Sequence, residues 1–197
     1  MARAHSKVRQ GEETAGTLVD IGMRLFSTHG FHGVSAEQIV ESAGLSRGAL
    51  YHHFGGKLGL FEAVFVECER EIASRIEAAA RRKQVSVDQL VAGSIAFLDA
   101  CADSALRRIV IDDAPSVLGW SKWREIDAAH GLALLRGAVE RLRHEGKIEP
   151  YSVDALTYLL SGAMNELAMW VAESKAPQTD LRAAKRSIEA TILAIAR

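Results

Sequence analysis

Between residues 35 and 54 the chain carries start and stop signals for two short helices, which leave little freedom in how this segment folds. Ser35 and Gln38 have the spacing of a capping box, in which each side chain satisfies a free backbone N–H at a helix start. Gly44 can take the left-handed conformation that ends this helix and turns the chain. Ser46 caps a second helix, and a pair of glycines ends it. Two short helices joined by a tight glycine turn are typical of a helix-turn-helix.

Helical patterns continue through the rest of the chain. The composition is 48% hydrophobic with few runs of alternating Val, Ile or Thr, so we expect an all-α protein of about nine helices. A first helix with one apolar stripe ends at Gly30, and a long connecting helix is expected over residues 57–83. Three segments follow from this reading, with boundaries 1–56, 57–83 and 84–197.

The second short helix has an unusual outward face. Leu50 and Phe54 share its inner side, whereas Gly48 and His52 lie nearly opposite. A glycine within a helix costs roughly 1 kcal/mol relative to alanine, so a merely solvated face would gain by replacing it. A helix pressed into the DNA major groove benefits from the missing side chain, which favours DNA as the partner.

Polar residues around this glycine suit DNA recognition. Arg47 can pair with the O6 and N7 atoms of guanine, and Tyr51, His52 and Lys57 can reach phosphates or base edges. The net charge of −1 carries little information, because the positions of the cations matter more than their sum. Three further cations, Arg3, Lys7 and Arg9, are expected to precede the first helix.

The stretch LFSTHGFHGVSAEQIVESAGLSRGALYHHFGGKLGLFEAVF resembles the N-terminal domain of the TetR family of transcriptional regulators. The resemblance covers roughly residues 14–65. It implies a homodimeric repressor whose residues 1–56 bind a palindromic double-stranded DNA operator. Residues 84–197 would then form a ligand-binding and dimerisation domain, with a small apolar or aromatic molecule as the inducer. Two cysteines without CxxC spacing, and a polar start without an apolar leader segment, separately indicate the reducing cytoplasm.

By position, the resemblance makes Ser35 and Lys57 phosphate anchors and gives Tyr51 a contact with the DNA backbone or a thymine methyl group. The full predicted DNA-contacting set is Ser35, Ser46, Arg47, Gly48, Ala49, Tyr51, His52, His53 and Lys57. Ala36 departs from the hydroxyl or basic residue often found there, and Glu37 places an acid near the groove. Glu37 could accept a hydrogen bond from N4 of cytosine, but we expect it to be solvated and to contribute nothing to base recognition.

An effector pocket is expected among the helices from residue 86 to residue 169. Ser86 and Gln89 have capping-box spacing at the start of this region. A chain break is expected at Asp112 and Asp113, and two tryptophans near these acids are candidates for a pocket wall. The predicted lining residues are Phe97, Cys101, Trp120, Trp123, Met164, Asn165 and Trp170.

Two apolar helices, expected over residues 152–173 and 180–196, end the chain. The resemblance implies that they pair with their copies as a four-helix dimer interface, whereas their pattern alone fits the core of a monomer equally well. The predicted dimer contacts are Leu156, Leu160, Ala163, Leu167, Ile188 and Ile192.

Two alternatives remain open at this stage. The chain could be a DNA-binding regulator without a small-molecule inducer, or an all-α enzyme in which Asp112, Asp113 and His130 perform acid-base chemistry. The enzyme is disfavoured because these residues lack metal-ligand or catalytic spacing. No cofactor or metal is expected. No membrane partner is expected either, since no 18-residue stretch is apolar and uncharged.

Overall fold

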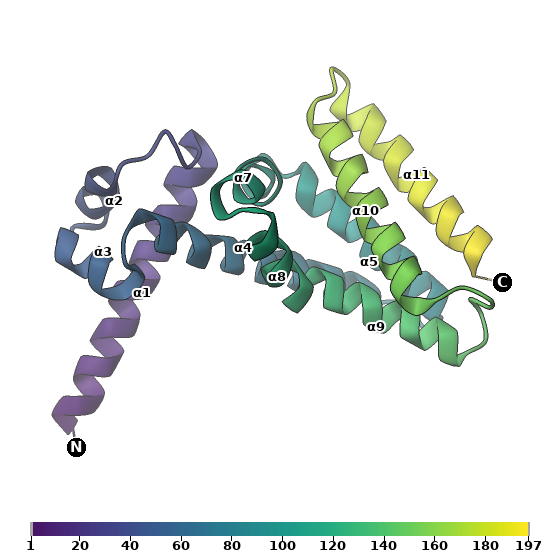
Figure 1. The fold of residues 1–197 in the computed structure, drawn as a ribbon, viewed down its shortest axis with the longest axis horizontal. Coiled ribbons are helices and arrows are strands. Elements are labelled where there is room, and N and C mark those ends of the chain that lie inside the picture. The colour runs from purple at the N-terminus through teal and green to yellow at the C-terminus, as the bar shows by residue number, and fades with distance from the viewer. Residues whose placement is uncertain (1, 197) are drawn as a thin grey trace.

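The computed structural model describes the backbone of residues 2–196 and the side chains of residues 9–196. The described chain is helical throughout (Figure 1). Its elements are α1 (Ala2–His29), α2 (Ala36–Ala43), α3 (Arg47–Phe54), α4 (Lys57–Ala80), α5 (Ser86–Ala102), α6 (Ser104–Arg107), the π-helical segment η1 (Arg108–Asp113), α7 (Ala114–Leu118), α8 (Trp120–Ala129), α9 (Gly131–His144), α10 (Val153–Ala172) and α11 (Pro177–Ile195). The all-α prediction is confirmed.

The predicted end signals around α2 and α3 are all present. The hydroxyl of Ser35 accepts from the N–H of Gln38, whose side chain accepts from the N–H of Ser35, so the capping box is complete. Gly44 has φ of 64° and ends α2. The hydroxyl of Ser46 accepts from the N–H of Ala49 at the start of α3.

Three local expectations are wrong. Residues 3, 7 and 9 lie inside α1, because this helix begins at Ala2 and not shortly before its apolar stripe. Ser86 forms no capping box: Val85 is the N-cap of α5, and the hydroxyl of Ser86 donates to Glu145 instead. The break expected at residues 112 and 113 is absent, since η1 runs directly into α7. Short helices between residues 104 and 129 account for the difference from about nine helices.

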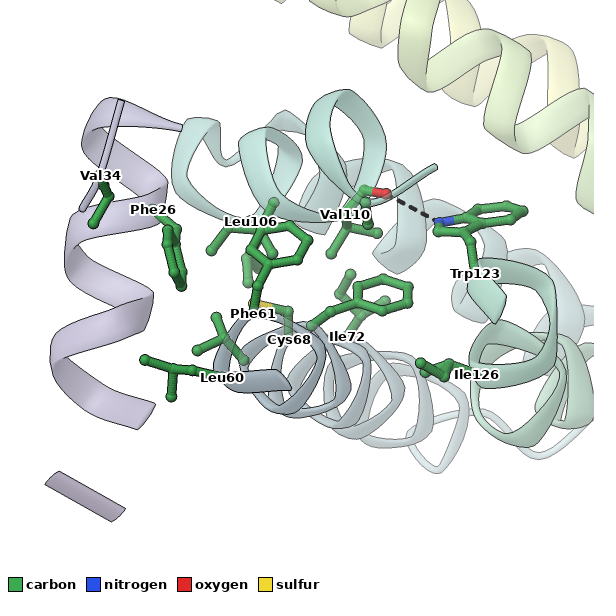
Figure 2. Close-up of a cluster of buried hydrophobic side chains, with 14 of the residues drawn as sticks. Phe26, Val34, Leu60, Phe61, Cys68, Ile72, Leu106, Val110, Trp123 and Ile126 are labelled. Atoms are coloured by element: carbon green, nitrogen blue, oxygen red, sulfur yellow. Dashed lines mark hydrogen bonds between the residues drawn. The ribbon is translucent and has the colours of Figure 1, made fainter. Parts of the chain in front are cut away.

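One hydrophobic core joins the helix-turn-helix to the middle of the chain. Phe26 of α1 and Phe61 of α4 meet edge to face at 5.2 Å between ring centroids. The same cluster contains Leu106, Val110 and Trp123, which come from α6, η1 and α8 (Figure 2). A second core joins α5, α9, α10 and α11. The first core therefore does not stop at the end of the helix-turn-helix.

The arrangement leaves α2 and α3 at one end of the molecule and α10 with α11 at the other, with α4 running between them (Figure 1). Among the described residues, no single helix has the length and hydropathy of a membrane span. The pair Ser86–Ala102 and Ser104–Leu118 passes that test jointly by length and composition, with a bend of 82°.

Candidate DNA interface and effector cavity

The outward face of α3 is bare at its centre. Leu50 is fully buried and fixes the rotation of α3, so that Arg47, Gly48 and His52 are exposed. A β-carbon at Gly48 would meet only the hydroxyl of Ser46, at 3.6 Å. No other described part of the chain covers this position, and the backbone of α3 is open to a close approach from outside.

Arg47 is held by neighbouring side chains. Its Nη1 atom lies 2.8 Å from Oε1 of Glu37 on α2, and its guanidinium lies 5.4 Å from the ring centroid of Tyr51. Glu37 is solvated, as expected, and the structure adds an ion pair with Arg47 that was not anticipated. All three side chains remain largely exposed, so the pair is screened by water and contributes little stability. It nevertheless orients the guanidinium on the same face as Gly48.

Lys57 has a structural role that the sequence did not reveal. Its ammonium donates to the carbonyl oxygens of Phe31 at 3.0 Å and Val34 at 2.8 Å, and lies 4.0 Å from the ring centroid of Phe31. These bonds fix the loop between α1 and α2 to the start of α4. An ammonium has three N–H groups, so one stays free for a phosphate.

The remaining predicted DNA contacts differ in accessibility. Ser35, Ser46, Tyr51 and His52 are exposed, whereas Ala49 is half-buried. His53 is also half-buried: its ring packs next to Phe54, and its Cε1 would lie 3.8 Å from a β-carbon at Gly11 of α1. His53 is thus directed partly towards α1, and it is the weakest member of the predicted set.

The α1–α2 loop is docked onto η1. The N–H of Phe31 donates to Oδ2 of Asp113 at 2.7 Å, and the Arg108 guanidinium lies 3.6 Å from Oδ1 of the same carboxylate. Gly30 has φ of 70°, which favours glycine, and the guanidinium of Arg108 lies against its Cα on the side where a β-carbon would stand. Asp113 therefore connects the helix-turn-helix to the body of the protein and forms no part of a pocket wall.

The three residues considered for acid-base chemistry each contact a different partner. Asp112 lies 3.5 Å from Arg107, Asp113 holds Phe31, and Nδ1 of His130 lies 2.8 Å from the carbonyl oxygen of Ile126. Within the described residues, no group of three or more His, Cys, Asp or Glu side chains could hold a metal ion. This arrangement gives no support to the enzyme alternative.

A cavity of about 370 Å³ lies between α4, α5, α9 and α10, a size that suits a small organic ligand. Three predicted residues line it, namely Phe97, Met164 and Asn165. The other four do not. Cys101 is buried in the second core, Trp123 in the first, and Trp120 and Trp170 are exposed on the surface.

The two neighbouring tryptophans of α8 have opposite environments. Trp123 is 4% exposed, and its indole N–H donates to the carbonyl oxygen of Val110 at 3.2 Å (Figure 2). Trp120 is 62% exposed and stacks on Trp123 with 4.9 Å between ring centroids. Trp123 is a core residue, and Trp120 shields it on the outside.

We expect Trp123→Ala to lower the free energy of unfolding by about 3 kcal/mol, because it removes a large buried side chain and leaves the carbonyl of Val110 without its donor. Trp120→Ala should cost less than about 1 kcal/mol. Urea denaturation followed by circular dichroism measures both. Equal losses in the two variants would contradict the core role of Trp123.

The cavity wall is mostly apolar with a few buried polar groups. Ser94 of α5 is 3% exposed, and its hydroxyl has no hydrogen-bond partner in the described structure. Asp127 of α8 pairs with Arg124 at 2.8 Å. Burial raises the pKa of Asp127, while Arg124 and His130 act in the opposite direction. A buried hydroxyl that lacks a partner inside a cavity favours a ligand carrying a polar group.

The predicted dimer contacts need revision. Leu156, Leu160, Ile188 and Ile192 are buried within the single chain, and Ala163 and Leu167 pack against the same core. The last two helices instead expose a different apolar set, consisting of Tyr158, Leu159, Met169, Trp170 and Leu193. Helical periodicity identified the two apolar helices, but it did not distinguish residues that face the chain's own core from residues on the exposed side.

An exposed helix-turn-helix joined to a helical body with an internal cavity is the architecture of a DNA-binding regulator. Comparison with known proteins agrees. Residues 18–64 match the model of bacterial regulatory proteins of the tetR family, and residues 87–195 match that of the tetracyclin repressor-like C-terminal domain. The chain belongs to the TetR family. It is a DNA-binding transcriptional regulator and not an enzyme.

Similar proteins extend over nearly the whole chain. The Tn10 TetC protein of Escherichia coli is 27% identical over 161 residues, which cover 80% of each chain. A TetR-family regulator from Pectobacterium atrosepticum superposes with a TM-score of 0.80 at 27% identity, covering 95% of this chain and 96% of that one. Regulator FadR from Bacillus subtilis, solved in complex with stearoyl-CoA, shares the fold at 20% identity with a TM-score of 0.73, covering 92% and 98%.

Proposed function

We propose that the protein is a homodimeric repressor, acting in the cytoplasm, that binds a palindromic operator and releases it when a small apolar or aromatic effector enters the cavity. The bare, exposed position at Gly48 carries the DNA-reading part of this proposal. Around it, Arg47, Tyr51 and His52 supply groups that can contact base edges and phosphates. Ser35, Ser46, Ala49, His53 and Lys57 complete the proposed surface.

Dimerisation is supported by the exposed apolar side of α10 and α11. Tyr158, Leu159 and Trp170 are between 45% and 62% exposed on one helix, which is unfavourable for a surface that stays in water. A two-fold dimer would cover this side and present two copies of α3 to successive major grooves of a palindrome.

Effector control is supported by α4, which contacts both the cavity and the helix-turn-helix. Ile76 and Ala80 of α4 line the cavity, and the first residue of α4, Lys57, holds the loop that precedes α2. An effector that favours a different position of α4 would therefore shift the relative placement of the two copies of α3. A hundredfold change in DNA affinity requires about 2.7 kcal/mol of differential binding.

The proposal is tested by a mobility-shift assay at two salt concentrations on the DNA upstream of the protein's own gene. We expect selective binding with two chains per site, an affinity that falls as salt rises, and a loss of at least tenfold in Arg47→Ala. Binding that is equal on unrelated DNA would contradict operator recognition, and a single chain per site would contradict the dimer.

The docking of the helix-turn-helix can be tested separately. We expect Asp113→Ala to speed hydrogen exchange at the amide of Phe31 and to lower stability by about 1–3 kcal/mol, since this N–H loses its charged acceptor. Asp112→Ala is the matched control, because Asp112 contacts Arg107 and not the loop. Equal exchange at Phe31 in both variants would contradict the role of Asp113.

A further inference from the structure

One buried carboxyl group beside the cavity lacks a cationic partner among the described residues. Glu69 of α4 is 4% exposed, and no hydrogen bond or ion pair to it exists among the described residues. It lies two helical turns before Ile76, which lines the cavity, but Glu69 itself is not a lining residue. Buried carboxylates are normally paired, because burial of an isolated charge is costly. Glu69 therefore needs an explanation.

The carboxyl groups of Glu69 and Asp127 both lie close to a glycine of the cavity wall. A β-carbon at Gly131, the first residue of α9, would stand 3.5 Å from Oδ1 of Asp127 and 3.8 Å from Oε2 of Glu69. Both Gly131 and Asp127 line the cavity. Because residue 131 has no side chain, it does not cover these two carboxyl groups on the side of the cavity.

The rest of the wall is suited to an apolar molecule. Leu90, Phe97, Leu132, Leu135 and Met164 line it, and the hydroxyl of Ser94 has no partner. We propose that the cavity binds an amphipathic amine, with its protonated ammonium group between Glu69 and Asp127 beside Gly131 and its apolar body along these side chains. This inference rests on the proposed effector cavity and names the chemical class of its ligand.

The surroundings of Glu69 determine its protonation state in the empty cavity. The groups that face it are Asp127 of α8, with Arg124 and His130 next to that aspartate, and the buried thiol of Cys101 on α5. Burial, followed by the charge of Asp127, raises the pKa of Glu69 to about 8. In the empty cavity at pH 7 Glu69 is therefore mostly a neutral acid. An incoming ammonium favours its carboxylate, so the proton of Glu69 is released to solvent.

An anionic ligand is the competing class, because Arg81 and Arg141 also border the cavity. Both are exposed, and Arg81 is already paired with Glu77 at 2.5 Å. Exposed cations are screened by water, whereas the carboxyl group of Glu69 is buried and lacks a counter-charge in the described chain. The balance favours a cation beside Gly131.

Isothermal titration with octylamine, octanol and octanoate at pH 7 tests the proposal on the intact protein. The three probes share one apolar chain, and the amine stays protonated at this pH. We expect octylamine to bind at least tenfold more tightly than octanol, and octanoate to bind most weakly. Titration in two buffers of different protonation enthalpy should show release of close to one proton per octylamine bound, and none for octanol.

Glu69→Gln should lose the proton release and at least tenfold in octylamine affinity, with octanol binding retained. Glu67→Gln is the matched control, since Glu67 is an exposed residue of the same helix and pairs with Arg70. Equal affinity for octanol and octylamine in the natural sequence, without proton release, would overturn the amine proposal and leave an effector cavity in place. Preference for octanoate would overturn it in favour of an anion. Failure of all three probes to bind would remove the cavity from the proposed function as well.

Discussion

Gly48→Leu is expected to leave the protein folded and at least as stable as the natural sequence, while its operator affinity falls at least a hundredfold. The new side chain would project into open space, since a β-carbon at this position meets only the hydroxyl of Ser46. Leucine is a better helix former than glycine, so the change in stability should be between zero and a gain of about 1 kcal/mol. On DNA the same side chain would hold the backbone of α3 away from the groove.

A loss of affinity together with unchanged or greater stability distinguishes a binding surface from a structural glycine. Urea denaturation measures the free energy of unfolding, and a mobility-shift assay on the same preparation measures operator affinity. Gly48→Ala should give an intermediate affinity. Gly16→Leu is the control, because Gly16 is an exposed helical glycine of α1 with nothing within 4 Å of its β-carbon position. If Gly48→Leu binds the operator as tightly as Gly16→Leu, α3 does not enter the groove at this point.

Glu69→Gln is expected to change how stability depends on pH. Burial raises the pKa of Glu69 in the folded protein to about 8, compared with 4.5 for the free side chain. Between these two values the folded state binds one proton more than the unfolded state. The free energy of unfolding therefore falls as pH rises from about 5 to 8, by up to about 1.4 kcal/mol per pH unit.

The total loss across this range is on the order of 4 kcal/mol. Glutamine does not titrate, so the variant should lack this decline and become more stable than the natural protein near pH 8. Urea denaturation at pH 5, 6, 7 and 8 measures the difference, with Glu67→Gln as the exposed control that should follow the natural sequence. Parallel curves for the natural protein and Glu69→Gln would mean that Glu69 is ionised in the folded state.

Local signals made the helix-turn-helix predictable. The bonds of Ser35, Gln38 and Ser46 join atoms only three residues apart, so their geometry follows from the sequence alone. The inward position of Leu50 and the outward position of Gly48 follow from helical periodicity in the same way. The outward face of α3 can therefore be predicted without any knowledge of the packing between distant segments.

Features that depend on distant segments were missed. Asp113 and Phe31 are 82 positions apart, and no local pattern links them. Periodicity identified Trp123 as part of a helix but could not distinguish a core tryptophan from one that lines a cavity. Leu156 and Ile188 were misplaced for the same reason, because a core and a dimer interface have the same composition. Glu69 gave no signal, since a glutamate in a helix is ordinarily solvated.

The core that joins α1 and α4 with α6, η1 and α8 has a consequence for chimeric regulators. A recognition module taken from a relative would bring its own counterparts of Phe26 and Gly30, and these must fit Phe61 and Arg108 of the recipient. Exchange of residues 1–56 alone would set two unmatched packing surfaces against each other. Successful transfer of operator specificity therefore requires substitutions confined to the outer face of α3, or joint transplantation of both sides of this contact.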